Sequence, residues 1–179
     1  MRLLLCRHAE AGRPAQAAEL ARHLAGTALA AVYTSPLTRA LTTAHAVAAL
    51  HQLAPVSRDE LREIDLGDVA GLQFEDYPPE LQSALLAAPA TVRFPGGESY
   101  DDLRARVVAA IAEIVALHSD ESVAVISHAG PIRAALATWL EAAPAAAFRI
   151  DQSFAAVNVV DWIDGTPFVR LVNGARVDR

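Results

Sequence analysis

Two histidines in this sequence follow short apolar runs, each at the point where a buried strand would end. The run Leu3–Cys6 is followed by Arg7 and His8, and the run Val123–Ile126 is followed, after one serine, by His128. Short apolar runs of this kind predict buried strands. Ligands of open α/β sheets bind at the carboxyl ends of the strands. If the two strands are neighbours, both imidazoles therefore face one pocket.

Two arginines would make this pocket suitable for an anion. Arg7 precedes the first histidine directly, and Arg39 lies in the first turn of a helix that Ser35 and Pro36 are predicted to start. A cation at that helix end is unfavourable unless an anion lies nearby; a solvent-exposed Arg39 is the alternative. Guanidinium groups bind phosphoryl oxygens in pairs. With the free amides ahead of the Pro131 helix, they predict a phosphoryl-binding site.

An imidazole beside a bound phosphoryl group can attack phosphorus and form a phosphohistidine, which water then hydrolyses. The attacking nitrogen must be unprotonated, so the other ring nitrogen needs an acceptor, usually a backbone carbonyl. Neighbouring guanidiniums favour the neutral ring because like charges repel. This chemistry needs no metal and no cofactor.

The elements that would position these residues alternate along the chain. Strands are predicted at 3–6, 30–34, 55–57, 123–126, 148–150, 156–162 and 168–172. Helices are predicted from Pro14 to near Gly26 and from Pro36 to Gln52. A long helix should end near His118, and another should start at Pro131. A turn at Asp164 and Gly165 would join the last two strands. The alternation predicts one domain over residues 1–179, a three-layer α/β/α sandwich with a mostly parallel sheet and an antiparallel edge strand.

Two segments lie outside this alternation. The charged stretch 59–67 is predicted to be irregular, and by composition alone its Glu63 would be one of several solvated carboxylates. The stretch 74–91 predicts one or two short helices that form a lid or wall, and its apolar residues hint at a small or partly apolar substrate. A capping box of Ser99 and Asp102 is predicted to start the long helix that follows.

Charge and hydropathy exclude two classes of partner. The formal net charge of −6 at pH 7 argues against a nucleic-acid-binding protein. No apolar run approaches the roughly 18 residues of a membrane-spanning helix. We therefore expect a cytoplasmic protein with no nucleic acid and no membrane among its partners.

Residue usage excludes other chemistry. All 15 basic residues are arginine, so Schiff-base lysine chemistry is excluded. Cys6 is the only cysteine, and a thiol inside an apolar strand is a poor nucleophile. His8-Ala9-Glu10 is similar to the His-x-Glu of zinc deaminases, but the Pro-Cys-x-x-Cys that those enzymes need is missing.

Five segments, in this order, resemble the motifs of the histidine phosphatase superfamily, which has the phosphoglycerate-mutase-like fold. They are Arg7-His8-Ala9-Glu10, Ser35–Ala40 with Thr42-Thr43-Ala44, Leu61–Leu72, Phe94–Ser99 and Val125–Arg133. The short chain and the stretches Gly67–Leu72 and Pro95–Ser99 are similar to the alpha-ribazole phosphatase and broad-specificity phosphatase branch. The resemblance implies a phosphatase rather than a mutase.

Particular roles follow from the resemblance. It implies that His8 is the nucleophile and Glu63 the general acid that protonates the leaving alkoxide. It further implies that the phosphoryl group is held by Arg7, His8, Arg39, His128 and Ala129. The implied reaction is hydrolysis of a small phosphorylated metabolite through a phosphohistidine, without metal or cofactor. A mutase-type phosphotransferase and a non-catalytic phosphate-binding module are the alternative functions. A separate expectation concerns assembly: the β-rich C-terminal region could pair two copies of the chain as a homodimer.

The sequence departs from the family pattern beside the first histidine. Ala9 replaces a glycine, which disfavours a left-handed backbone at this position. Ala11 lacks the hydroxyl that many relatives place after Glu10, and the usual longer loop with a phosphate-contacting asparagine is missing. These departures predict a looser phosphate clamp with lower affinity.

Overall fold

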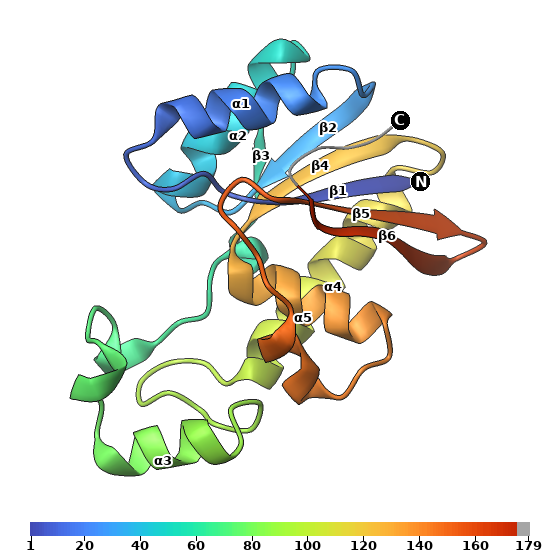
Figure 1. Cartoon of the computed structure of the whole chain (residues 1–179). Coiled ribbons are helices and arrows are strands. Elements are labelled where there is room, and N and C mark those ends of the chain that lie inside the picture. Colours follow the sequence, from blue (N-terminus) through green and yellow to red (C-terminus); the bar gives the residue numbers. More distant parts are fainter. Residues whose placement is uncertain (175–179) are drawn as a thin grey trace.

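The computed structural model describes residues 1–174 and contains a six-stranded sheet in the order β3-β2-β4-β1-β5-β6 (Figure 1). The strands are β1 (Arg2–Arg7), β2 (Leu29–Thr34), β3 (Val56–Ser57), β4 (Ser122–Ser127), β5 (Val157–Ile163) and β6 (Thr166–Gly174). β1 to β4 pair in parallel, whereas β5 runs antiparallel to both β1 and β6. The predicted mostly parallel sheet is confirmed, with its reversed strand one position inside the edge.

Helices cover both faces of the sheet (Figure 1). They are α1 (Pro14–Leu24), α2 (Thr38–Leu50), α3 (Pro79–Ala87), α4 (Tyr100–Leu117) and α5 (Ala129–Trp139), with 3-10 turns at Asp59–Leu61, Gly67–Val69, Phe74–Asp76 and Pro144–Arg149. α1 and α2 lie on one face, and α4 and α5 on the other. No helix in residues 1–174 is long and apolar enough to cross a membrane.

The apolar residues of β1 are buried on both faces of the sheet, as a three-layer arrangement requires. Leu3 and Leu5 pack into the core beneath α4 and α5, whereas Leu4 and Cys6 pack into the core beneath α1 and α2. A strand that is buried on both faces is apolar at every position, which is why the run shows no alternation. Burial raises the pKa of the Cys6 thiol to about 12, so this thiol stays protonated and unreactive.

Two helices begin at different residues from those predicted. α2 starts at Thr38 with Leu37 at its N-cap, two residues later than predicted, because the backbone at Leu37 is still extended. α5 starts at Ala129 with His128 at its N-cap, two residues before Pro131. The capping box of Ser99 and Asp102 is present in both directions, as predicted.

The predicted strand at 148–150 is wrong. Phe148 and Arg149 belong to the 3-10 turn Pro144–Arg149, and the Phe148 side chain is 47% exposed. Proline at the first position and three consecutive alanines favour a helical turn over an extended run. The turn at Asp164 and Gly165 is confirmed: both residues have positive φ, as a tight turn between antiparallel strands requires.

The segment between η2 (Gly67–Val69) and α4 extends away from the layers and carries α3 (Figure 1). Its two ends are joined by backbone hydrogen bonds from Asp68 to Pro95 (2.8 Å) and from Glu98 to Asp65 (2.9 Å). Gly67 permits this close approach, because a Cβ there would lie 2.1 Å from the Pro95 oxygen. The predicted short helices outside the main layers are confirmed.

Candidate active site

The two histidines leave neighbouring strands at the same edge of the sheet. β1 and β4 pair in parallel with Arg7 opposite Ser127, so the next residues, His8 and His128, emerge side by side. Their ring centroids are 4.9 Å apart, with an angle of 62° between the planes. Both residues are buried. The parallel pairing therefore brings together the two imidazoles that the sequence analysis singled out.

The environment of His8 defines which nitrogen carries its proton. Nδ1 lies 2.7 Å from the Ala9 carbonyl oxygen, which can only accept, so Nδ1 is the protonated nitrogen. Nε2 accepts a hydrogen bond from Nε of Arg39 at 3.2 Å. Burial lowers the pKa of His8, and the nearby Arg39 and Arg7 charges lower it further. His8 is thus a neutral imidazole with its lone pair on Nε2.

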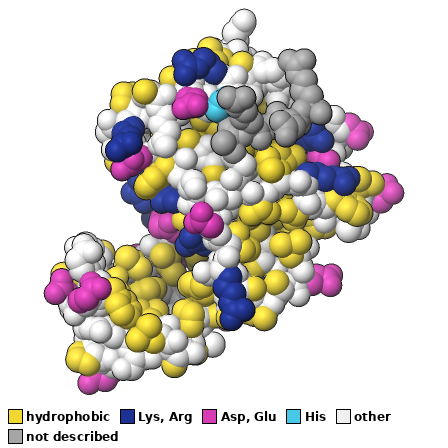
Figure 2. Space-filling model, viewed as in Figure 1, with side chains coloured by type: hydrophobic (Ala, Val, Ile, Leu, Met, Phe, Trp, Pro, Cys, Tyr) yellow, Lys and Arg dark blue, Asp and Glu magenta, His cyan; other side chains and the backbone are white. Residues whose placement is uncertain are grey.

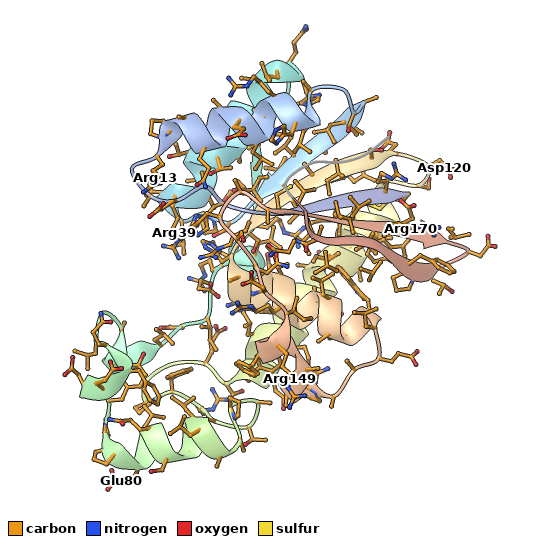
Figure 3. All side chains as sticks on the ribbon, in the orientation of Figure 1. Arg13, Arg39, Glu80, Asp120, Arg149 and Arg170 are labelled. Carbon is orange, nitrogen blue, oxygen red and sulfur yellow. The ribbon has the colours of Figure 1, made fainter. Side chains whose placement is uncertain are left out.

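Arg39 lies in the first turn of α2, at the edge of the sheet that faces the α3 segment (Figure 3). Its contact with His8 shows that the guanidinium turns inward, so the alternative of a solvent-facing Arg39 does not hold. The positive charge therefore lies beside the two imidazoles.

Arg7 is held by residues that the sequence analysis did not identify. Its guanidinium carbon lies 3.8 Å from the centre of the Phe154 ring, and Nη1 donates to the Gln152 carbonyl. Nε of Arg7 is buried and has no hydrogen-bond partner within the described residues. Gln152 and Phe154 lie in the irregular segment before β5, where no local pattern indicates a contact with β1.

His128 contacts a hydroxyl on one side and nothing polar on the other. Nε2 lies 2.7 Å from Oγ of Ser35, whereas Nδ1 is buried with no partner in the part of the chain that the structure describes. Burial, with help from the Arg39 charge, lowers the pKa of His128 to about 2. Ser35 was predicted to start a helix together with Pro36. Its hydroxyl does accept from the Leu37 amide at 3.3 Å, but it also faces His128.

The low pKa of His128 predicts a pH dependence of stability. In the unfolded chain this histidine takes up a proton near the ordinary histidine pKa of 6.5, whereas in the folded protein it does so only at about 2. The free energy of unfolding therefore falls as pH falls through this window, and His128 alone should make it about 2 kcal/mol lower at pH 5 than at pH 8. Burial also lowers the pKa values of His8 and His51, which act in the same direction.

Urea unfolding of the wild type and of His128→Gln between pH 5 and pH 8 measures this effect. The glutamine keeps a polar side chain but cannot titrate, so the variant should have a shallower dependence by about 2 kcal/mol over this range. Parallel curves for the two proteins would contradict a neutral, buried His128.

Glu63 lies against the start of α5. Oε2 accepts from the Gly130 amide at 3.3 Å, and Oε1 accepts from the Ile64 amide at 3.0 Å. A Cβ on Gly130 would lie 2.2 Å from Oε1, so only glycine permits this approach. Because Gly130 is two residues after His128, the carboxylate is fixed at the start of α5. It is half-buried and is not a fully solvated member of the acidic run.

Arg106 of α4 holds the loop that carries Glu63. Nη1 donates to the carbonyl oxygens of Glu60 (2.6 Å) and Arg62 (2.8 Å), and Nη2 donates to that of Glu63 (3.1 Å). The same guanidinium binds both carboxylate oxygens of Glu98 at 2.7 and 2.8 Å. Nothing in the helical pattern of α4 sets Arg106 apart from its neighbours, since the loop it holds lies more than 40 residues earlier in the chain.

We expect Arg106→Ala to lower the free energy of unfolding by about 3 kcal/mol, because Glu98 loses its charged partner and three carbonyl groups lose the guanidinium that donates to them. Arg104→Ala on the same helix is the matched control: its ion pair with Asp101 is largely exposed, so the loss should be below about 1 kcal/mol. Urea unfolding of the two variants provides the comparison, and equal losses would contradict this role of Arg106.

Ala9 fits its position without strain. The φ angle of Ala9 is not positive, so the backbone here is not left-handed and does not require a glycine. Its amide donates to Oγ1 of Thr43 at 3.0 Å.

A cavity of about 450 Å³ lies between the short loop after Ala9 and the first turns of α2, and Arg39 lines it. Within residues 1–174, no group of three or more histidine, cysteine or acidic side chains is arranged to hold a metal ion.

Comparison with known proteins assigns the family. The profile of the histidine phosphatase superfamily (branch 1) matches residues 3–174. The chain belongs to this superfamily. Its relatives carry the names of different activities, so the family alone does not define the reaction of this chain.

Curated relatives match most of the chain. It is 36% identical over 149 residues to the bifunctional protein Rv2228c of Mycobacterium tuberculosis, a match that covers 81% of this chain and 41% of that protein. It is 34% identical over 123 residues to phosphoserine phosphatase 1 of Hydrogenobacter thermophilus, covering 66% of this chain and 58% of the relative. The chain thus spans about half the length of these relatives.

Solved structures of other proteins have the same fold. The alpha-ribazole phosphatase of Shigella flexneri superimposes with a TM-score of 0.88 at 22% identity, covering 100% of this chain and 99% of the other. YhfR of Bacillus stearothermophilus gives 0.87 at 26% identity, covering 99% and 98%. The predicted phosphoglycerate-mutase-like architecture is confirmed.

Proposed function

We propose that this protein is a phosphomonoesterase that transfers a phosphoryl group to Nε2 of His8 and then to water. The observation that carries the proposal is the state of His8: the Ala9 carbonyl holds the proton on Nδ1, so the Nε2 lone pair faces the guanidinium of Arg39. A neutral, oriented imidazole beside a fixed cation is suited to attack an anionic phosphoryl group.

The neighbouring donors would hold the phosphoryl oxygens. Ser35 Oγ already accepts from an amide, so its proton is free to bond Nε2 of His128, which leaves Nδ1 of His128 as the donor. Nδ1 of His128 and Nε of Arg7 are both buried without a protein partner within residues 1–174. With the Ala129 amide at the start of α5 they supply hydrogen-bond donors, and the Arg7 and Arg39 guanidiniums supply the positive charge that phosphoryl transfer requires, without a metal.

Glu63 would serve the leaving group. As Nε2 of His8 attacks phosphorus, the bond to the ester oxygen breaks, and protonated Glu63 gives its proton to the departing alkoxide. Water then attacks the phosphohistidine, Glu63 takes one proton from it, and inorganic phosphate leaves with His8 regenerated. The hydrogen bonds from Gly130 and Ile64 support this role because they hold the carboxyl group beside the pocket.

A mutase is the second candidate, since the chain is 31% identical over 147 residues to a 2,3-bisphosphoglycerate-dependent phosphoglycerate mutase of Thermoplasma acidophilum. The surroundings of Glu63 favour the phosphatase. A mutase must hold a substrate with a second charged group, whereas the cavity beside Glu63 is lined mainly by apolar side chains. The phosphoserine phosphatases among the relatives also support hydrolysis.

The test is an assay of p-nitrophenyl phosphate hydrolysis in the presence of a chelator, with acid-labile, base-stable phosphoprotein trapped by rapid quench. We expect turnover, an N-linked phosphoryl group and no effect of the chelator. Conversion of 3-phosphoglycerate to 2-phosphoglycerate faster than release of phosphate would favour the mutase. Binding of inorganic phosphate without any turnover would favour a non-catalytic module.

A further inference from the structure

A second cavity adjoins the proposed catalytic residues on the side of α3. It measures about 220 Å³, and Glu63 and Gly130 form part of its wall. Most of the remaining wall is apolar, from Ile64, Leu85, Pro89, Phe94, Leu103 and Phe148. Figure 2 shows hydrophobic side chains around the hollow between the α3 segment and the body of the molecule.

The position of this cavity matches the alcohol half of an ester. If phosphorus lies beside His8, the ester oxygen must lie within reach of Glu63, and the organic group continues past Glu63 into the cavity. Arg133 also lines the cavity, with its Nε bound to the Ile150 carbonyl at 2.7 Å. Its charge is close enough to Arg7 to lower the pKa of that residue, so it lies near the phosphoryl end.

Tyr100 is a wall residue of the cavity that carries a hydroxyl unpartnered within the described residues. It is 4% exposed, lines the cavity, and its hydroxyl is buried with no hydrogen-bond partner among residues 1–174. A buried hydroxyl without a partner costs about 1–3 kcal/mol. Burial raises its pKa to about 12, so the hydroxyl keeps its proton and can donate. An acceptor on a bound molecule would satisfy it.

The volume of the cavity limits the size of the organic group that the alcohol can carry. A cavity of about 150 Å³ is enough for benzene, so about 220 Å³ accommodates one aromatic ring with a small substituent. Burying a carboxylate or an ammonium against these apolar walls would be costly, because Arg133 and Glu63 are the charged lining residues in the described chain and both lie at the phosphoryl end.

We propose that this cavity is the alcohol subsite and selects phosphomonoesters whose alcohol carries a compact, uncharged ring with one hydrogen-bond acceptor that Tyr100 recognises. The proposal rests on the proposed phosphatase function and adds the class of substrate to it. It makes Tyr100 and Leu85 specificity determinants of the reaction.

The first experiment tests the apolar wall with benzyl phosphate, ethyl phosphate and phosphoserine. We expect kcat/KM of the wild type for benzyl phosphate to exceed that for each of the other two by at least about tenfold. Leu85→Trp fills the cavity and should remove most of this preference while kcat/KM for ethyl phosphate changes little. Leu86→Trp is the matched control, because Leu86 is 75% exposed on the same helix and should change neither value.

The second experiment tests the hydroxyl with the three pyridylmethyl phosphate isomers, which keep the ring size of benzyl phosphate and add one acceptor. At least one isomer should react with the wild type better than benzyl phosphate does. Tyr100→Phe should lower kcat/KM for that isomer by about tenfold and leave the value for benzyl phosphate unchanged. Its thermal unfolding temperature should be no lower than that of the wild type, because the lost hydroxyl is buried and has no protein partner among residues 1–174.

The outcomes separate the two proposals. If p-nitrophenyl phosphate is not hydrolysed, the phosphatase proposal fails and this inference fails with it. If it is hydrolysed but phosphoserine or ethyl phosphate is preferred to benzyl phosphate, the subsite alone is wrong. Equal effects of Leu85→Trp and Leu86→Trp, or an equal effect of Tyr100→Phe on benzyl and pyridylmethyl phosphates, would likewise overturn the subsite.

Discussion

His8→Ala is expected to lower kcat/KM for p-nitrophenyl phosphate by at least about 1,000-fold, because no other side chain in the described site can form the covalent intermediate. His128 is close, but its Nε2 lies 2.7 Å from Oγ of Ser35, so its lone pair is engaged there and not free to attack. Steady-state assays and quench trapping measure the loss, and the variant should show no acid-labile phosphoprotein.

His45→Ala is the control for this variant, since His45 is exposed on α2 and should be neutral in the same assay. Binding of inorganic phosphate to His8→Ala, measured by calorimetry, checks that the proposed anion site of Arg7 and Arg39 is intact in the variant. If His8→Ala binds phosphate, remains folded and keeps more than about a tenth of the wild-type turnover, His8 is not the nucleophile.

Glu63→Gln should produce the second large effect, and this effect should depend on the leaving group. For benzyl or ethyl phosphate we expect a loss of about 100-fold or more in kcat/KM, because an alkoxide leaves only when it is protonated. For p-nitrophenyl phosphate the loss should stay within a few fold, since nitrophenolate leaves without a proton. Glutamine keeps the size of Glu63 and can still accept from the Gly130 amide.

Glu60→Gln is the matched control in the same loop. The Glu60 carboxylate pairs with Arg58 and is partly exposed, whereas only its backbone carbonyl contacts Arg106. This substitution should therefore leave both classes of substrate within about twofold of the wild type. If Glu63→Gln slows alkyl and nitrophenyl esters to the same extent, Glu63 is not the general acid of this site.

The layers and the edge of the sheet that holds the site were predictable from the sequence. The runs at Leu3–Cys6 and Val123–Ile126 are apolar at every position, and burial on both faces explains such a pattern. The parallel neighbours β1 and β4 then place His8 and His128 at one edge, because each histidine follows its strand directly.

Local sequence patterns predicted helix starts and short strands less reliably where the same residues are compatible with more than one conformation. Ser35 and Pro36 have the residue types of a helix start, yet α2 begins at Thr38 and the serine hydroxyl faces His128. The stretch around Phe148 resembles a strand, but Pro144 and the alanines that follow it turn helical. At Ser35 a contact with His128, far along the chain, accompanies the later helix start, whereas around Phe148 one local preference outweighs another.

What the sequence by itself determined is the class of fold and which residues stand at the strand ends, since burial imposes a regular pattern of apolar residues on every core strand. Only the tertiary structure decided which groups surround those ends. Phe154 packs on Arg7, Arg106 holds the Glu63 loop, and Tyr100, whose hydroxyl has no partner among the described residues, lines the cavity beside Glu63. These contacts join residues far apart in the chain. The pattern of apolar and polar residues does not predict them, because each contact depends on the orientation of an individual side chain in the folded protein.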